Sequence, residues 1–397
     1  MTLEAPPQGV TSASGRSIFF DLMRGLASQM VVVGHALNVF LPAYFMEQAA
    51  SGRLEARGGL FYAQNLGVLL FFYISGFLIT ASAQRKVSSG LGFLDFAADR
   101  VARIFTPLIP MLLLVFALDH AVFANAAATS RYSDINASIG DLLLNATMLA
   151  GNPALATVAE RTGLTWLSSA SFGSADQLWT VIVEWWIYIV FGFGFFVVAA
   201  RQRSSLAGWV LCGALLAIAL PLMIGTALNT PGLIIAWVAG MLVRLLRPPL
   251  ERIPRFALLG FAIIALAGAA VRLSITEQDL YDPLTAALLA VTFFGTLLAI
   301  DSFSAVANRP SLMRVVQFMS NISYSLYLVH FSLLIWSVHL FPELVGHPSG
   351  VVLLFAVCNL AAWLFFLGFE RHYPRVRVQL QTLLDRLPRA RVEQAQA

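Results

Sequence analysis

Charged residues are scarce in this chain, at 12% of its 397 positions, whereas hydrophobic residues make up 58% and the mean hydropathy is +0.77. In soluble domains roughly a quarter of the residues are charged. The composition therefore excludes an ordinary soluble domain. It predicts an all-α polytopic membrane protein.

Cysteine is nearly absent as well. Cys212 and Cys358 both fall inside apolar runs, which gives no support to a disulfide framework or a cysteine-based metal cluster. No histidine pair has the spacing of metal ligands, so we expect no metal. The N-terminal fifteen residues lack the pattern of a cleaved signal peptide, so the first apolar run is expected to stay as an anchor. The net charge of +4 is small and is distributed in a way that reports topology, so nucleic acid is not an expected partner.

Apolar runs long enough to cross about 30 Å of hydrocarbon predict about ten transmembrane helices. They lie near 18–41, 63–84, 104–124, 178–200, 206–226, 230–247, 256–273, 283–301, 316–341 and 349–371. Nineteen of the 25 basic residues fall in connections on the side of the N-terminus, five fall on the opposite side, and Arg24 lies within a span. Because cytoplasmic loops carry the basic excess, both termini are predicted to be cytoplasmic.

This arrangement predicts three parts: a cytoplasmic segment at 1–17, a transmembrane domain at 18–371, and a basic cytoplasmic tail at 372–397. The tail has a possible short helix at 378–387 lying on the inner surface. The longest connection, 125–177, is predicted to be external. Its apolar stretch at 142–149 is too short to span and is interpreted as a cap or an interfacial segment.

The first span contains three ionisable residues: Asp21, Arg24 and His35. Such groups each cost a few kcal/mol at the centre of a bilayer, roughly 2.5 to 3.5 for Arg or Asp, so they usually face a protein interior or a wet cavity. Eleven residues separate Arg24 from His35, which places them roughly 16 Å apart along a helix and about 20° from one face. One helix face could thus carry a cation near one membrane surface and a base near the other.

Two further segments have competing interpretations. The Ser75–Gly76 pair is either a close contact between helices or a place where a substrate approaches. Arg100 and Arg103 lie one turn apart and suit phosphate binding, but they also suit an interfacial helix whose arginines meet lipid headgroups, with Asp99 pairing Arg103.

Polar residues also interrupt the fourth and ninth predicted spans. Glu184 lies six residues from the outer end of its span, where a functional carboxylate and a structural ion pair are both reasonable. Ser323, Tyr327 and His330 share one helix face. His35, Glu184 and His330 all fall in the outer half of the predicted membrane, whereas Arg24, Arg100 and Arg103 lie at or near the inner side. Histidine is the side chain most readily poised as a base near neutral pH, and a carboxylate can fix its tautomer.

Together these segments resemble the acyltransferase-3 family of integral membrane acyltransferases. The resemblance rests on five elements in the expected order, at 20–35, 71–79, 100–103, 179–188 and 322–330. The third matches an arginine pair, although Pro107 follows Arg103 by four residues rather than three. The family's closing Glu-x-Pro is imperfect, because Glu370 precedes Pro374 by four residues. This departure leaves Glu370 with no predicted role beyond pairing with Arg24.

The resemblance implies transfer of an acyl group, typically acetyl, from acetyl-CoA to a hydroxyl on a cell-envelope or exported glycan, in a multi-pass protein of the bacterial inner (plasma) membrane. The proposed coenzyme A ligands are Arg24, Arg100 and Arg103. In this interpretation His35 is the general base and Glu184 orients it, with His330 as an alternative base. The expected cavity residues are Ser75, Trp179, Ser323, Tyr327 and His330. The expected partners are acyl-CoA, the hydroxyl-bearing acceptor and the lipid bilayer.

Two other functions fit the same intramembrane residues. A transporter or exporter of a small polar solute would use the Arg, Glu and His side chains as a binding or proton path. A structural subunit of an envelope assembly would tolerate substitution of His35 and Arg103.

Overall fold

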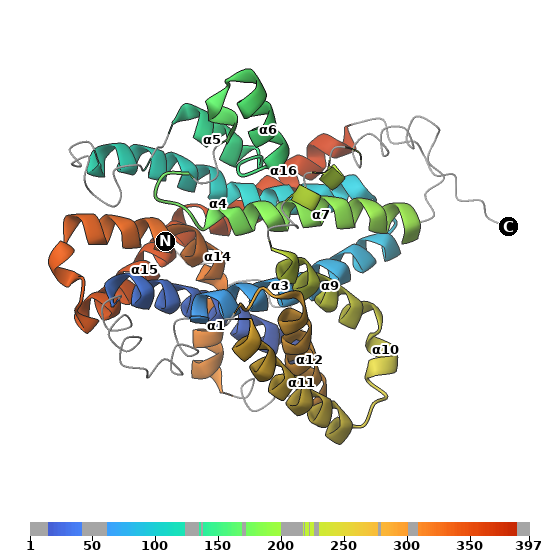
Figure 1. Cartoon of the computed structure of the whole chain (residues 1–397). Coiled ribbons are helices and arrows are strands. Elements are labelled where there is room, and N and C mark those ends of the chain that lie inside the picture. Colours follow the sequence, from blue (N-terminus) through green and yellow to red (C-terminus); the bar gives the residue numbers. More distant parts are fainter. Residues whose placement is uncertain are drawn as a thin grey trace, which may run out of the picture.

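The chain is built from helices, as the computed structural model shows (Figure 1). The structure describes residues 15–41, 62–123, 135, 138–168, 172–199, 217, 219–221, 223–225, 230–276, 279–300 and 309–386, and no strand occurs among them. The long helices are α1 (Gly15–Phe40), α3 (Ala63–Ser88), α4 (Phe93–Val122), α7 (Leu178–Ala199), α9 (Pro231–Leu245), α11 (Arg255–Ile275), α12 (Pro283–Ala299), α14 (Pro310–Leu340) and α15 (Pro348–Gly368).

Six segments are both long enough and apolar enough to cross a membrane: α3, α4, α7, α11, α14 and the stretch from α15 onward. Helices α9 and α12 are shorter and apolar. A helix satisfies its own backbone hydrogen bonds, which a lipid environment requires. The prediction of an all-α polytopic membrane protein is confirmed. Nine of the ten predicted spans coincide with helices, and the tenth, 206–226, lies largely outside the described residues.

Four of these helices begin with proline in their first turn, namely α9, α12, α14 and α15. Proline fits there because the first amides of a helix have no intrahelical partner and its φ is already helical. Close helix crossings depend on glycine. A Cβ on Gly76 would lie 1.9 Å from the Trp237 carbonyl oxygen, and one on Gly240 would lie 2.2 Å from that of Tyr73. Helices α3 and α9 therefore touch backbone to backbone.

Helix α4 differs from its prediction at its beginning. It starts at Phe93 rather than at 104 and continues through Pro107 and Pro110. The Asp95 side chain accepts a hydrogen bond from the Gly92 backbone N–H at 3.0 Å and closes the first turn. Neighbouring groups can compensate for interior prolines in membrane helices. Arg100 and Arg103 consequently belong to one long helix with the third span, not to a separate connection.

Part of the connection at 125–177 folds against α4 and α7 (Figure 1). It contains α5 (Ile139–Ala146), α6 (Pro153–Thr162) and the short helix η3 (Thr165–Ser168). The Trp186 indole N–H donates to the Met148 carbonyl at 2.7 Å, and Leu144 and Met148 are buried. The apolar stretch at 142–149 is thus too short to span, as predicted, and anchors this unit to the bundle.

After α15 the chain turns through η5 (Glu370–His372) into α16 (Tyr373–Asp385). Helix α16 packs on α4. Its Arg377 contacts the buried carboxylate of Asp99 at 2.7 Å, and Lys86 reaches the same carboxylate at 2.8 Å. The predicted tail helix is confirmed, with earlier bounds. The alternative in which Asp99 pairs with Arg103 is wrong, because α16 and α3 supply the partners of Asp99.

Candidate active site

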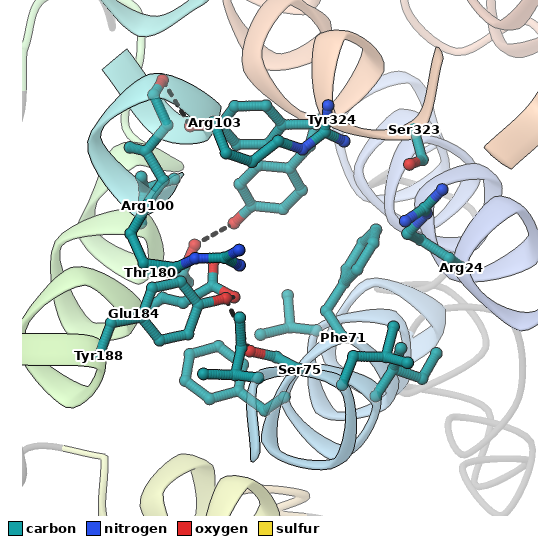
Figure 2. Close-up of a pocket in the computed structure, with 18 residues that line it drawn as sticks. Arg24, Phe71, Ser75, Arg100, Arg103, Thr180, Glu184, Tyr188, Ser323 and Tyr324 are labelled. Atoms are coloured by element: carbon teal, nitrogen blue, oxygen red, sulfur yellow. Dashed lines mark hydrogen bonds between the residues drawn. The ribbon is translucent and has the colours of Figure 1, made fainter. Parts of the chain in front are cut away.

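A cavity of about 980 Å³, including its open mouth, is lined by residues of α1, α3, α4, α7 and α14 (Figure 2). Guanidinium groups approach it from two of these helices, and a carboxyl group and several hydroxyl groups face them. Seven of the ten predicted site residues line it: Arg24, Ser75, Arg100, Arg103, Glu184, Ser323 and Tyr327. Segments distant in sequence therefore converge on one space.

Arg24 reaches the cavity from α1, where α1 meets α14. One Nη of its guanidinium donates to the Ser320 hydroxyl at 2.5 Å and lies 3.4 Å from Asp21, while Ser320 donates to Asp21 at 2.9 Å. The Nε of Arg24 is buried and has no hydrogen-bond partner in the described structure. The residue is held in place with donor capacity to spare, as an anion-binding group requires.

Arg100 is the cavity arginine with the fewest partners. Its guanidinium lies 5.7 Å from the centre of the Phe96 ring, and its buried Nε makes no hydrogen bond. Among the described residues no carboxylate lies within ion-pair distance of it. A guanidinium presents several N–H donors in a planar fork that matches phosphate oxygens.

Arg103 is fixed more firmly. Its Nη1 lies 2.8 Å from Oε1 of Glu370, a residue with no exposed surface. The guanidinium also lies 4.9 Å from the Tyr373 ring centre and 5.9 Å from that of Tyr324. Oε2 of Glu370 accepts from the backbone N–H of Ser325 at 3.0 Å and from its hydroxyl at 2.5 Å.

The expected pairing of Glu370 with Arg24 is therefore wrong. Glu370 follows the end of α15 and meets α14 and α4 at Ser325 and Arg103, whereas Arg24 is held by Asp21 and Ser320. Glu370 joins three helices and sets the position of Arg103 at the cavity wall.

A directional hydrogen-bond chain leads to Glu184. The Trp237 indole can only donate, and it reaches the Ser75 hydroxyl at 3.1 Å. Ser75 lies 2.7 Å from the Tyr188 hydroxyl, and Tyr188 donates to the Glu184 carboxylate. Because the Tyr188 hydroxyl donates its proton to Glu184, the Ser75 hydroxyl must be the donor in its bond with Tyr188. Every bond in the chain thus points toward the carboxylate of Glu184, which in Figure 2 is drawn beside Arg100 and on the opposite side of the cavity from Arg24.

The close contact between helices is confirmed at Gly76, whereas the approach of a substrate at Ser75 stays a prediction. Gly76 makes the close contact with α9, and Ser75 lines the cavity and belongs to the chain that ends at Glu184.

His35 and His330 face each other with ring centres 5.4 Å apart, and the Phe331 ring lies 5.0 Å from His35. Nδ1 of His330 lies 2.8 Å from the Tyr327 carbonyl and 3.2 Å from that of Leu326. Carbonyl oxygens only accept, so Nδ1 carries the proton and Nε2 presents a lone pair. His330 is 1% exposed, and its Nε2 has no partner in the described structure.

Neither histidine belongs to the cavity wall. The Tyr327 ring lines the cavity and lies 5.7 Å from the His330 ring between centres, so the histidine pair adjoins the cavity at Tyr327. The predicted orientation of His35 by Glu184 stays a prediction, since the ring beside His35 is that of His330. Trp179 lies away from the cavity, 6.3 Å from the Tyr281 ring between ring centres.

Sequence reasoning did not single out Thr180, Tyr188 or Tyr324, which all line the cavity. The signal for Tyr188 was present, because it follows Glu184 by one helical turn. Nothing local indicates that Trp237 completes the chain from another helix.

Among the described residues, no three His, Cys, Asp or Glu side chains gather where they could hold a metal ion. The absence of a metal stays a prediction. The described chain thus forms a helical membrane protein whose cavity joins three guanidinium groups to a hydrogen-bonded carboxyl group, with an imidazole pair at one end.

The chain belongs to the acyltransferase-3 family, because residues 17–367 match the family's model, which describes an acyltransferase domain. It is also similar to an O-acetyl transferase of Shigella phage Sf6, with 38% identity over 104 residues. That match covers 26% of this chain and 27% of the phage protein. No solved structure matches the chain.

Proposed function

We propose that this protein transfers an acyl group, in the first instance acetyl, from cytoplasmic acyl-CoA to a hydroxyl of a cell-envelope or exported glycan at the outer side of a bacterial inner membrane. Family membership and the similarity to an O-acetyl transferase support acyl transfer. One observation carries the finer proposal: three arginines line a cavity whose opposite end adjoins the pair His35–His330.

In this proposal the arginines bind the phosphates of coenzyme A. Arg100 and Arg24 have unpaired buried N–H donors, and Arg103 is fixed by Glu370. The pantetheine arm then extends along α1 toward His35, over the roughly 16 Å that eleven helical residues span. This places the thioester near the imidazole pair.

His35 is proposed as the general base. It takes the proton of the acceptor hydroxyl while the oxygen attacks the thioester carbonyl. The new C–O bond forms, the C–S bond breaks, and the proton passes from His35 to the departing sulfur. His330, with its Nε2 lone pair, is proposed to receive a hydrogen bond from His35 and hold that ring in place. Glu184 is proposed to line the donor path and to balance the charge of the arginines.

The transfer could instead run through an acyl-enzyme, and the two routes give different partial reactions. Protein incubated with radiolabelled acetyl-CoA and no acceptor retains covalent label after denaturation only if an acyl-enzyme forms.

Mass spectrometry of envelope polysaccharides tests the proposed function. Deletion of the gene is expected to remove an O-acetyl group, wild-type protein to restore it, and a His35→Ala protein of equal abundance to fail. Full acetylation by that variant would exclude His35 as the base. Acetylation that is unchanged by deletion, together with solute movement by purified protein in vesicles, would favour a transporter instead.

A further inference from the structure

An aromatic pair, Phe71 and Tyr327, forms part of the cavity wall. Their ring centres are 5.9 Å apart in an edge-to-face arrangement, and both side chains line the cavity. Tyr327 lies seven residues along α14 from Ser320, which holds Arg24, so Tyr327 and Ser320 are about 10 Å apart along the helix axis.

Tyr327 is tethered at its hydroxyl as well as packed at its ring. The hydroxyl is hydrogen-bonded to Thr180 on α7 and donates to the Gln177 carbonyl at 3.2 Å. Gln177 in turn donates from Nε2 to the Leu328 carbonyl at 2.5 Å. The side chain therefore cannot swing away without breaking contacts between α7 and α14.

The histidines lie directly beyond this aromatic pair. His330 contacts the Tyr327 ring at 5.7 Å between centres. On α1, an added Cβ at Gly34 would lie 2.5 Å from the Gln64 backbone nitrogen, so the neighbouring His35 lies at the level of Gln64 on α3. Val68, which lines the cavity, is one turn further along α3, about 6 Å away.

We propose that Phe71 and Tyr327 determine which acyl groups the enzyme transfers. The inference rests on the proposed function, in which a donor bound by the arginines presents its thioester to His35. An acyl group must then fit beside these two rings. Acetyl adds one methyl group at this point and fits, whereas each further methylene meets an aromatic edge that the tether holds in place. The substrate class at this site is therefore short-chain acyl-CoA.

The test compares acetyl-, butyryl- and hexanoyl-CoA as donors, with release of the CoA thiol as the readout in membranes that contain the native acceptor. The measured quantity is the ratio of kcat/KM for hexanoyl-CoA to that for acetyl-CoA. Wild type is expected to have a low ratio. Phe71→Leu and Tyr327→Ala are each expected to raise it about tenfold or more, since one methylene in an apolar pocket alters discrimination by roughly 10- to 200-fold.

Tyr327→Phe removes the tether but keeps the ring, so its ratio is expected to lie between those of wild type and Tyr327→Ala. Phe293→Leu serves as the matched control, because the Phe293 ring contacts Tyr73 at 5.8 Å between centres and does not line the cavity. Its ratio should equal that of wild type. Should Tyr327→Ala fail to fold, Phe71→Leu carries the test.

Two results would overturn the inference. The first is a wild-type protein that uses hexanoyl-CoA as efficiently as acetyl-CoA. The second is that folded Phe71→Leu and Tyr327→Phe proteins turn over acetyl-CoA but keep the wild-type ratio of kcat/KM for hexanoyl-CoA to that for acetyl-CoA. Failure of the proposed function looks different. In that case wild type releases no CoA from any of the three donors, and the inference falls with it.

Discussion

Arg100, Arg103 and Arg24 share a cavity but differ in what holds them. Arg103 is bound by a buried carboxylate and two tyrosine rings, Arg24 by Asp21 and Ser320, and Arg100 by one aromatic face. Most of the hydrogen-bonding capacity of the Arg100 guanidinium is unused and available to a phosphate, whereas Arg103 already pairs with Glu370. If the cavity binds the donor as proposed, Arg100 is the first candidate for its phosphate ligand, a ranking that helical spacing alone does not provide.

Arg100→Ala is accordingly expected to raise KM for acetyl-CoA at least tenfold with a smaller change in kcat, because a hydrogen bond to a charged group contributes about 1.5–3 kcal/mol. Steady-state CoA release measures this. Arg375→Ala is the matched control, since Arg375 is exposed on α16 and lies 3.4 Å from His372. An Arg100→Ala protein with the wild-type KM would exclude a donor-binding role.

Glu370→Gln is expected to destabilise the fold by about 1.5–3 kcal/mol, because the buried carboxylate loses its charge-assisted contact with Arg103. Melting in detergent reports this loss. The same variant should raise KM for acetyl-CoA by releasing Arg103. Glu343→Gln, which changes an exposed carboxylate in the turn before α15, should leave both properties unchanged. A Glu370→Gln protein with wild-type melting would contradict the role assigned to this ion pair.

Among the elements, α11 and α12 pack against each other, and one carboxylate links the end of α11 to the start of α12. Asp282 receives Arg272 in two hydrogen bonds, at 3.0 and 3.1 Å, and it also caps α12 by accepting from the Thr285 backbone N–H at 2.9 Å. The Arg272 guanidinium holds the pKa of the Asp282 carboxyl well below its ordinary value. A carboxyl group with a lowered pKa stabilises the fold above its ordinary pKa and loses that contribution as the pH falls through the lowered value.

Asp282→Ala is therefore expected to lower stability by about 1 kcal/mol, the usual cost of losing a helix cap. Asp282→Asn keeps the cap and loses only the ion pair, so it should cost less. The difference in melting temperature between wild type and Asp282→Asn should shrink as the pH is lowered into the acid range. A pH-independent difference would show that the ion pair contributes nothing.

Most elements of this protein could be predicted from sequence, because a membrane-crossing helix needs only length and hydrophobicity. The convergence of Arg24, Ser75 and Glu184 could be anticipated because buried polar groups have few acceptable places. The ion pairs between helices were harder to predict from sequence. Nothing local shows that Glu370 contacts Arg103 rather than Arg24, since both pairings bring opposite charges together and only helix packing decides between them.

The bounds of α4 illustrate a second limit. The charged residues between 95 and 103 suggest a connection before the third span, yet the helix begins at Phe93 and includes them. The packing of helices likewise decides that Tyr327 lines the cavity and His330 does not, whereas the periodicity of α14 only places both residues on one face.

For the whole molecule, the basic residues predict cytoplasmic termini. In a background with Cys212 and Cys358 replaced by serine, a cysteine at Ala397 should react with an impermeant thiol reagent only in inside-out vesicles. A cysteine at Arg53 should react only in right-side-out vesicles. The reverse pattern would invert the orientation, and the donor would then have to arrive from the outside.

The proposed passage of an acyl group from coenzyme A at one end of the cavity to an acceptor at the other can be measured. Inside-out vesicles from cells that carry the gene test it directly, with acetyl-labelled acetyl-CoA added outside. We expect label on glycan in the vesicle lumen with wild-type protein and a loss of at least a hundredfold with His35→Ala, in line with the roughly 10²–10⁴-fold that general bases contribute. Equal labelling by wild type and by an equally abundant His35→Ala protein would contradict it.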